Sequence, residues 1–119
     1  ALDATNGVVC EVTDDEILEE KALIGRHGFG CEPASAASVA GLRQLLTSGT
    51  INRDATVVCI LTGHALKDPD ATVKYHTGID TKGVSISPGT SKPTGRHANL
   101  PIRVPDDIDA ICKAIESAN

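Results

Sequence analysis

The sequence predicts an α/β fold, with a small, partly parallel sheet and packed helices. Two apolar, β-branched runs at residues 7–12 and 55–62 are typical of buried strands. Two helix patterns separate these runs, which gives the order strand, helix, helix, strand. This crossover is long enough to place Val8–Val12 and Thr56–Leu61 side by side as parallel strands of one sheet.

The first predicted helix follows the first strand directly. Thr13 and Glu16 have the spacing of a capping box, so the helix should begin at Asp14. Three acidic residues in its first turn favour this start, and Arg26 with Gly28 marks its end.

The second predicted helix starts with Pro33 and runs to about Ser48, before Gly49. Its first half is almost free of bulky side chains, with the residues Ala34, Ser35, Ala36, Ala37 and Ser38. Two explanations remain open, tight packing against the sheet and the close approach of a ligand.

The second strand ends at Thr62-Gly63-His64. Ligands of open α/β sheets bind beyond the carboxyl ends of the strands, so this end is the expected binding position.

The C-terminal part has weaker patterns. Residues 77–99 form an irregular connection rich in Gly and Pro, and Pro101–Val104 are expected to add an edge strand. The last helix should start near Asp106 or Asp107, bury one apolar face and close the sheet. That face consists of Ile108, Ile111, Cys112 and Ile115.

Composition excludes several classes of protein. The chain of 119 residues has a formal net charge of −5, and only Phe29 and Tyr75 could stack on bases, which argues against nucleic-acid binding. The apolar stretch Val57–Leu61 is far shorter than the roughly 20 residues of a membrane-spanning helix. The four widely spaced cysteines fit neither a metal site nor a disulfide framework, so we expect buried thiols and a cytoplasmic location.

Two dense motifs stand out from this background. They are Cys-Glu-Pro-Ala-Ser-Ala-Ala-Ser at residues 31–38 and Leu-Thr-Gly-His-Ala-Leu-Lys-Asp-Pro-Asp at residues 61–70. Their order and separation resemble the C-terminal portion of threonine synthase, a family of fold type II enzymes that use pyridoxal 5'-phosphate. The resemblance covers most of Val12–Tyr75 and is loose from Thr77 onward.

The resemblance implies a set of cofactor-binding residues. Thr62 stands where the family places a hydroxyl against the pyridine nitrogen of the cofactor. Glu32, Ala34 and Ser35 would line the cofactor, and Gly63 would leave room for it. Two alternatives stay open at this point, since Thr62 could simply end a strand and Glu32 could be only a helix cap.

No catalytic residue and no metal ligand is assigned. His64 and Lys67 are expected to shape the loop rather than to react. The family's Schiff-base lysine and its glycine-rich phosphate loop have no counterpart in this sequence. The chain alone is therefore expected to be inactive and to bind the cofactor weakly or not at all.

The resemblance implies that residues 1–119 are a single C-terminal fragment of an enzyme that converts O-phospho-L-homoserine and water to L-threonine and phosphate. One alternative is a fragment of another fold type II enzyme, a serine or threonine dehydratase. Another is a noncatalytic stand-alone domain for binding or assembly. A truncated sheet exposes an edge, so formation of a homo-oligomer is expected more readily than for an intact domain.

Overall fold

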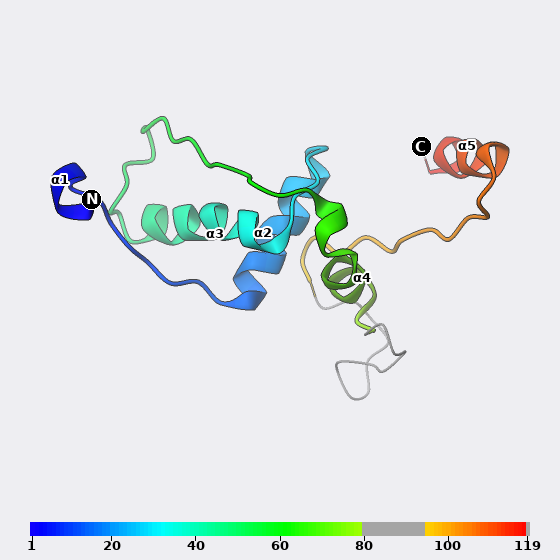
Figure 1. Ribbon diagram of the computed structural model, residues 1–119, viewed down its shortest axis with the longest axis horizontal. Helices are drawn as coiled ribbons and strands as arrows, with labels where there is room; N and C mark the ends of the chain where they lie inside the picture. The colour runs from blue at the N-terminus through cyan, green and yellow to red at the C-terminus, as the bar shows by residue number, and fades with distance from the viewer. Residues whose placement is uncertain (80–94, 119) are drawn as a thin grey trace.

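The computed structural model describes residues 1–79 and 95–118. Its elements, in chain order, are the helices α1 (Leu2–Thr5), α2 (Asp14–Arg26) and α3 (Pro33–Thr47), the 3-10 helix η1 (Ala65–Lys67), and the helices α4 (Pro69–Thr77) and α5 (Ile108–Ser117) (Figure 1).

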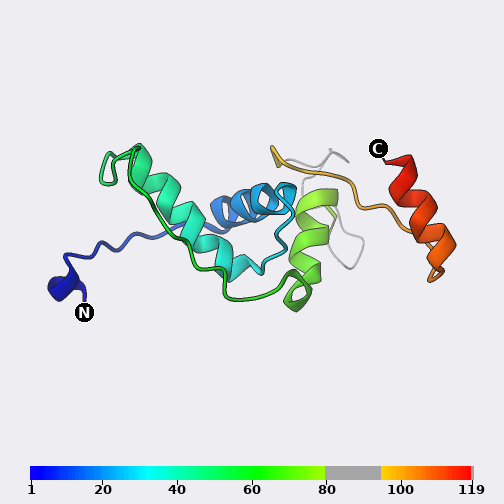
Figure 2. The ribbon, with the colours of Figure 1, turned by 90° about the horizontal axis from the view of Figure 1, so that it is seen from above.

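The packed part of the molecule is the pair α2 and α3, with α4 against α2 (Figure 2). The buried apolar side chains at the helix pair are small, Ala22 on α2 and Ala36 and Ala40 on α3. Small side chains let two helix backbones approach closely, which explains the bare first half of α3. Polar contacts complete the pairing, because Arg43 Nε donates to Glu20 Oε1.

The predicted beginnings of α2 and α3 are confirmed. The Thr13 hydroxyl accepts from the Glu16 amide at 3.3 Å, and the Thr13 amide donates to Glu16 Oε2 at 2.7 Å, which completes the capping box. The second helix starts at Pro33 as predicted and ends at Thr47, with Gly49 at a positive φ of 74° just beyond it.

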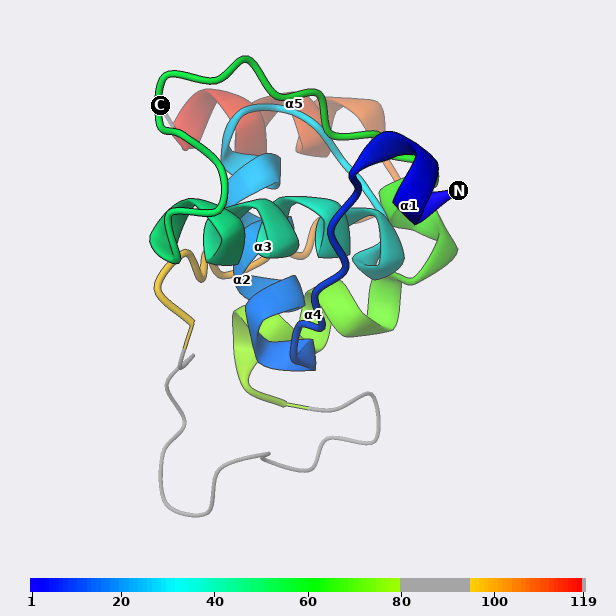
Figure 3. The ribbon, with the colours of Figure 1, turned by 90° about the vertical axis from the view of Figure 1, so that its left-hand side faces the viewer.

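The predicted parallel sheet is not confirmed. Residues 8–12 and 55–62 contain no helix and no strand, and an isolated antiparallel bridge joins Cys31 to His64. Both segments line a groove of about 530 Å³ against α3, which they approach from different sides (Figure 1, Figure 3). A Cβ on Gly41 of α3 would lie 3.0 Å from Cys10 Sγ, so this glycine allows the first segment to approach.

These two segments form no sheet because one side of each segment is left uncovered. Val58 is 83% exposed and Val9 is 73% exposed. A parallel strand is normally covered on both faces, and here α3 contacts the segments from one direction only. The prediction of two buried strands is therefore not confirmed, because these apolar side chains are exposed and no partner completes a sheet within the described residues.

Helix α4 was not predicted. Asp68 caps it, since Asp68 Oδ1 accepts from the Ala71 amide at 3.0 Å, and Pro69 occupies its first position. Gly78 ends it at a positive φ of 68°. The sequence Asp68-Pro69, a capping residue followed by proline, is a regular helix start.

The C-terminal predictions are partly wrong. Helix α5 begins as expected, with Asp107 Oδ2 accepting from the Ala110 amide at 2.9 Å. Its apolar face is not buried, however, because the side chains named for it are all exposed: Ile108, Ile111, Cys112 and Ile115. The helix lies apart from α2 and α3 (Figure 1, Figure 2).

The remaining C-terminal predictions concern irregular chain. Pro101–Val104 form no strand. Of the predicted irregular connection 77–99, residues 95–99 are irregular, Thr77 belongs to α4, and residues 80–94 lie outside the described part.

The radius of gyration of 17.2 Å exceeds the roughly 13–14 Å of a compact domain of this length.

The cysteine prediction holds for one residue. Cys31 is buried, whereas Cys10 and Cys112 are exposed and Cys59 is intermediate, and all four are free thiols. Within residues 1–79 and 95–118, no helix has both the length and the apolar character needed to cross a membrane.

Candidate functional site

The two motifs meet at the N-terminus of α3. The Glu32 amide donates to the Gly63 carbonyl at 3.0 Å, and the Ala65 amide donates to the Gly30 carbonyl at 3.3 Å. These bonds surround the bridge between Cys31 and His64 and hold the loop before α3 against the loop before η1.

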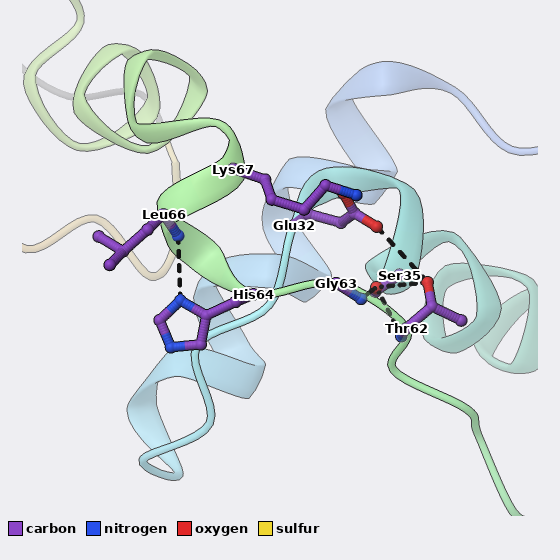
Figure 4. Close-up of polar contacts among 7 residues, drawn as sticks. All are labelled: Glu32, Ser35, Thr62, Gly63, His64, Leu66 and Lys67. Atoms are coloured by element: carbon purple, nitrogen blue, oxygen red, sulfur yellow. Dashed lines mark hydrogen bonds and ion pairs between the residues drawn. The ribbon is translucent and has the colours of Figure 1, made fainter.

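Ser35 fixes the second loop to the helix (Figure 4). Its Oγ accepts from the amides of Thr62 at 2.9 Å and Gly63 at 3.0 Å, and it lies 3.1 Å from Thr62 Oγ1. Ser35 is 2% exposed, so the hydroxyl that makes these part-buried hydrogen bonds is itself buried. One buried hydroxyl therefore sets the position of both loop residues.

The hydrogen-bond inventory determines the direction of the hydroxyl pair. A serine hydroxyl has one proton to donate and two lone pairs. Because Ser35 Oγ already accepts two amide protons, its own proton is left for Thr62 Oγ1. The Thr62 proton is then free for another acceptor, and here it is directed toward Glu32 Oε1 at the long distance of 3.5 Å.

Glu32 is held from the other side by Lys67. Lys67 Nζ lies 2.8 Å from Glu32 Oε2, and the Glu32 side chain is 15% exposed. A Cβ at position 63 would overlap the Glu32 carboxylate, so glycine is required there while this carboxylate keeps its place. Figure 4 shows the carboxylate lying over the Thr62–Gly63 segment.

His64 has a structural contact. Its Nδ1 accepts from the Leu66 amide at 3.2 Å and thereby caps η1. This contact agrees with the expectation that His64 shapes the loop. Lys67 was expected only to shape the loop, but its ion pair also holds the predicted site residue Glu32.

A cavity of about 420 Å³ lies beside this cluster, between residues 28–31 and 61–64. Its volume falls within the usual range for small-molecule sites, roughly 300–1,000 Å³. Thr62 and Gly63 line it, and Glu32, Ala34 and Ser35 do not. The described residues include no cluster of His, Cys, Asp or Glu side chains that could hold a metal ion.

The structure brings together four of the five predicted site residues. Glu32, Ser35, Thr62 and Gly63 form one network, and Ala34 is exposed on the first turn of α3. Thr62 thus lies within hydrogen-bond distance of Glu32 and Ser35, whereas the cofactor role of these residues stays a prediction. Sequence reasoning missed two contacts: the hydrogen bonds from the Thr62 and Gly63 amides to Ser35, called the Ser35 clamp below, and the ion pair of Lys67. Both depend on the meeting of two distant segments, so they leave no local signal.

Comparisons with known proteins place this cluster in a family context. No protein-family model matches the chain. The threonine synthase of Methanocaldococcus jannaschii is 53% identical over 78 residues, which is 62% of this chain and 19% of that protein. The threonine synthase of Methanosarcina acetivorans is 55% identical over 74 residues, which is 61% of this chain and 18% of that protein.

A bacterial relative agrees with the two archaeal ones. The threonine synthase of Halalkalibacterium halodurans is 52% identical over 67 residues, 56% of this chain and 19% of that protein. The matched region thus spans about one fifth of each relative's length. These matches confirm the resemblance to a C-terminal portion of threonine synthase over about 60% of this chain.

Proposed function

We propose that this chain supplies part of the cofactor-binding wall of a threonine synthase. Such an enzyme uses pyridoxal 5'-phosphate to convert O-phospho-L-homoserine and water to L-threonine and phosphate. The observation that carries the proposal is the position of Thr62, which lines the cavity while Ser35 leaves its hydroxyl proton directed toward Glu32 Oε1.

The residues present fit this cofactor. Thr62 Oγ1, which here donates to Glu32 Oε1, would hold the cofactor by donating instead to its unprotonated pyridine nitrogen. The bound cofactor supplies a sink for carbanion charge. Ser35 positions the hydroxyl, and the absence of a side chain at Gly63 leaves the space that the Glu32 carboxylate occupies.

Other parts of the site must come from elsewhere. None of the chain's lysines lies in a sequence that resembles the family's cofactor-binding lysine motif. The chain alone should therefore release no phosphate from O-phospho-L-homoserine and should give no stoichiometric lysine adduct after treatment with pyridoxal phosphate and borohydride. One defined adduct together with turnover would contradict this part of the proposal.

We also propose that residues 8–12 and 55–62 become strands of a parallel sheet when the rest of such an enzyme covers them. Their exposed apolar side chains and their position against α3 support this. The same exposed surface supports self-association of the isolated chain.

A chimera tests the function directly. In the threonine synthase of M. jannaschii, the matched 78 residues are replaced by those of this chain. We expect the chimera to form threonine. Thr62→Val should then lower turnover roughly tenfold or more, the effect of one hydrogen bond to the ring.

Two matched variants serve as controls. Thr47→Val makes the same change in α3, where the hydroxyl bonds only the Arg43 carbonyl at 2.8 Å among the described residues, and should leave turnover unchanged. His64→Ala should lower turnover less than Thr62→Val, because it removes a loop cap and no contact to the ring. Equal effects of Thr62→Val and Thr47→Val would contradict the role of Thr62.

Two other functions stay as candidates. A dehydratase fragment would give a chimera that consumes serine or threonine and forms no threonine from O-phospho-L-homoserine. A noncatalytic assembly domain is favoured by the exposed apolar side chains of α5 and would give a chimera that folds without any turnover.

A further inference from the structure

Lys21 is a buried cation that no carboxylate neutralises among the described residues. It is 8% exposed, and its Nζ donates to Thr72 Oγ1 at 2.7 Å. The two ion pairs in the described part are Arg43 with Glu20 and Lys67 with Glu32. Burial of an ammonium without a counter-charge is costly, and within residues 1–79 and 95–118 the partner of Lys21 is a neutral hydroxyl, which favours a bound anion beside it.

The neighbouring carboxylate cannot provide it. Glu20 precedes Lys21 on α2, and adjacent helix residues do not face each other. Glu20 is directed toward Arg43 of α3 instead, whereas Lys21 is directed toward Thr72 of α4.

Lys21 lines a cavity of about 290 Å³ whose titratable side chains are basic, apart from one thiol. Lys21 and Arg26 come from α2, His76 from α4, and His97 from the segment after residue 94. Cys31 is the thiol, and no Asp or Glu lines the cavity. The volume lies at the lower end of small-molecule sites, so a compact ligand fits best.

The two histidines add donors. His76 Nδ1 accepts from the Asn99 amide at 2.9 Å, and His97 Nδ1 lies 3.4 Å from Arg26 Nη1, which can only donate. In a neutral ring whose Nδ1 accepts, Nε2 carries the proton. Both rings at this cavity are therefore donors.

The charge of Lys21 influences the pKa of two neighbouring side chains. Burial lowers the pKa of His76, and the Lys21 ammonium lowers it further. Burial raises the pKa of the Cys31 thiol, and Lys21 opposes that rise. The charge of Lys21 thus acts on both neighbours.

We propose that this cavity between α2 and α4 binds a compact oxyanion of the phosphate type, with Lys21 as its central cation. The anion accepts from Lys21 Nζ and from the donors of His76, His97 and Arg26. The site differs from the proposed cofactor wall in its residues, so it does not depend on that function. Free phosphate and a phosphate monoester share this chemistry, and the test separates them.

The experiment is a titration of the 119-residue chain with inorganic phosphate, O-phosphoethanolamine, acetate or sodium chloride at equal ionic strength. The readout is the NMR signals of the histidine rings. Phosphate should shift His76 and His97 saturably and raise the pKa of His76, because the anion offsets the Lys21 charge. Shifts from phosphate alone indicate free phosphate as the ligand, and equal shifts from the monoester indicate a terminal phosphate group.

Variants locate the effect. Lys21→Met should weaken phosphate binding roughly tenfold or more, the effect of one charged hydrogen bond, and Lys21→Arg should restore most of it. The matched control is Lys74→Met, an exposed lysine of α4 that does not line the cavity, and it should change binding less than about twofold.

The proposal is overturned if phosphate causes no saturable shift of His76, if chloride or acetate causes an equal one, or if Lys21→Met and Lys74→Met bind alike. Circular dichroism checks that each variant keeps its helices. Should Lys21→Met lose them, Arg26→Gln at the exposed end of α2 replaces it and should still weaken binding.

Discussion

Helices α3 and α5 begin in similar ways and end in different surroundings. Both start after an acidic residue, Glu32 for α3 and Asp107 for α5, and both carry apolar residues at helical spacing. In α3, Ser35 and Ala36 are buried against other segments, whereas in α5, Ile108 is 75% exposed and Ile115 is 60% exposed.

The difference shows that local signals specify a helix but do not bury it. An Asp cap and an amphipathic pattern suffice to define the bounds of α5. Burial depends on a second surface, which α2 and the 61–64 loop provide for α3. The part of the molecule around α3 should therefore respond to substitutions that leave the α5 part unaffected.

Among the substitutions around α3, Ser35→Ala should lower the free energy of unfolding the most. It removes the acceptor of the Thr62 and Gly63 amides and leaves them without this partner at a part-buried position. We expect a loss of about 2–3 kcal/mol in the free energy of unfolding, from two unsatisfied donors. Chemical denaturation measures this loss, and hydrogen exchange should show faster exchange of both amides.

Ser38→Ala is the matched control, because the Ser38 hydroxyl bonds the Ser35 carbonyl at 2.9 Å from an exposed position. It should change stability by less than about 0.5 kcal/mol. Equal losses in the two variants would show that the clamp does not hold the loops together.

The fold could be predicted where the signal is local. The capping box of Thr13 and Glu16, Pro33 at a first helical position and Asp107 before an apolar pattern all predicted helix starts that the structure confirms. The burial of Ile108 and Ile115 could not be predicted, because it depends on a partner surface rather than on the helix itself.

The candidate site shows the same division. Thr62, Gly63, Glu32 and Ser35 were found from two motifs whose order resembles a family. That Ser35 would bind both loop amides follows only from the meeting of the two segments, as does the pairing of Lys67 with Glu32.

Gly63→Ala should have the next largest effect. The added Cβ would overlap the Glu32 carboxylate, which can move because it ends a flexible side chain. We expect loss of the Glu32–Lys67 pair and a decrease of about 1 kcal/mol in stability, the scale of one hydrogen bond. The Lys67 side-chain NMR signals and a denaturation curve test both effects.

Gly25→Ala should raise stability, in contrast to Gly63→Ala. No atom lies within 4 Å of a Cβ at position 25, which is in α2. Alanine should therefore stabilise the helix by about 0.5–1 kcal/mol. A loss at both positions would mean that the Gly63 effect does not come from Glu32.

Acid should weaken the start of α2. The hydrogen bond from the Thr13 backbone amide, with those from the Gln44 and Thr13 side chains, lowers the pKa of Glu16 below its ordinary value of 4.5. A lowered pKa in the folded state means that this contribution is present above pH 4.5 and is lost as the pH falls through the folded value.

Glu16→Gln should reduce this acid dependence, since glutamine keeps the capping geometry without titrating. Denaturation midpoints between about pH 3 and 6 measure it, over the range in which carboxyl groups titrate. Glu116→Gln on α5 is the control and should keep the acid dependence of the unchanged chain. If Glu16→Gln leaves the pH dependence of stability unchanged, Glu16 does not cause the loss of stability in acid.

Ile115→Lys should have the smallest effect, and it tests the contrast between α3 and α5 most directly. The side chain is 60% exposed, so little apolar surface is lost from the folded state, and the free energy of unfolding should stay within about 0.5 kcal/mol of the unchanged chain. A ten-residue helix is marginal without packing, so amides of α5 should exchange faster than those of α2 in both proteins. Sedimentation should show less self-association for the lysine variant, because a charge then interrupts the exposed isoleucine face. A stability loss above about 1 kcal/mol would mean that α5 packs as α3 does, and the contrast between the two helices would no longer hold.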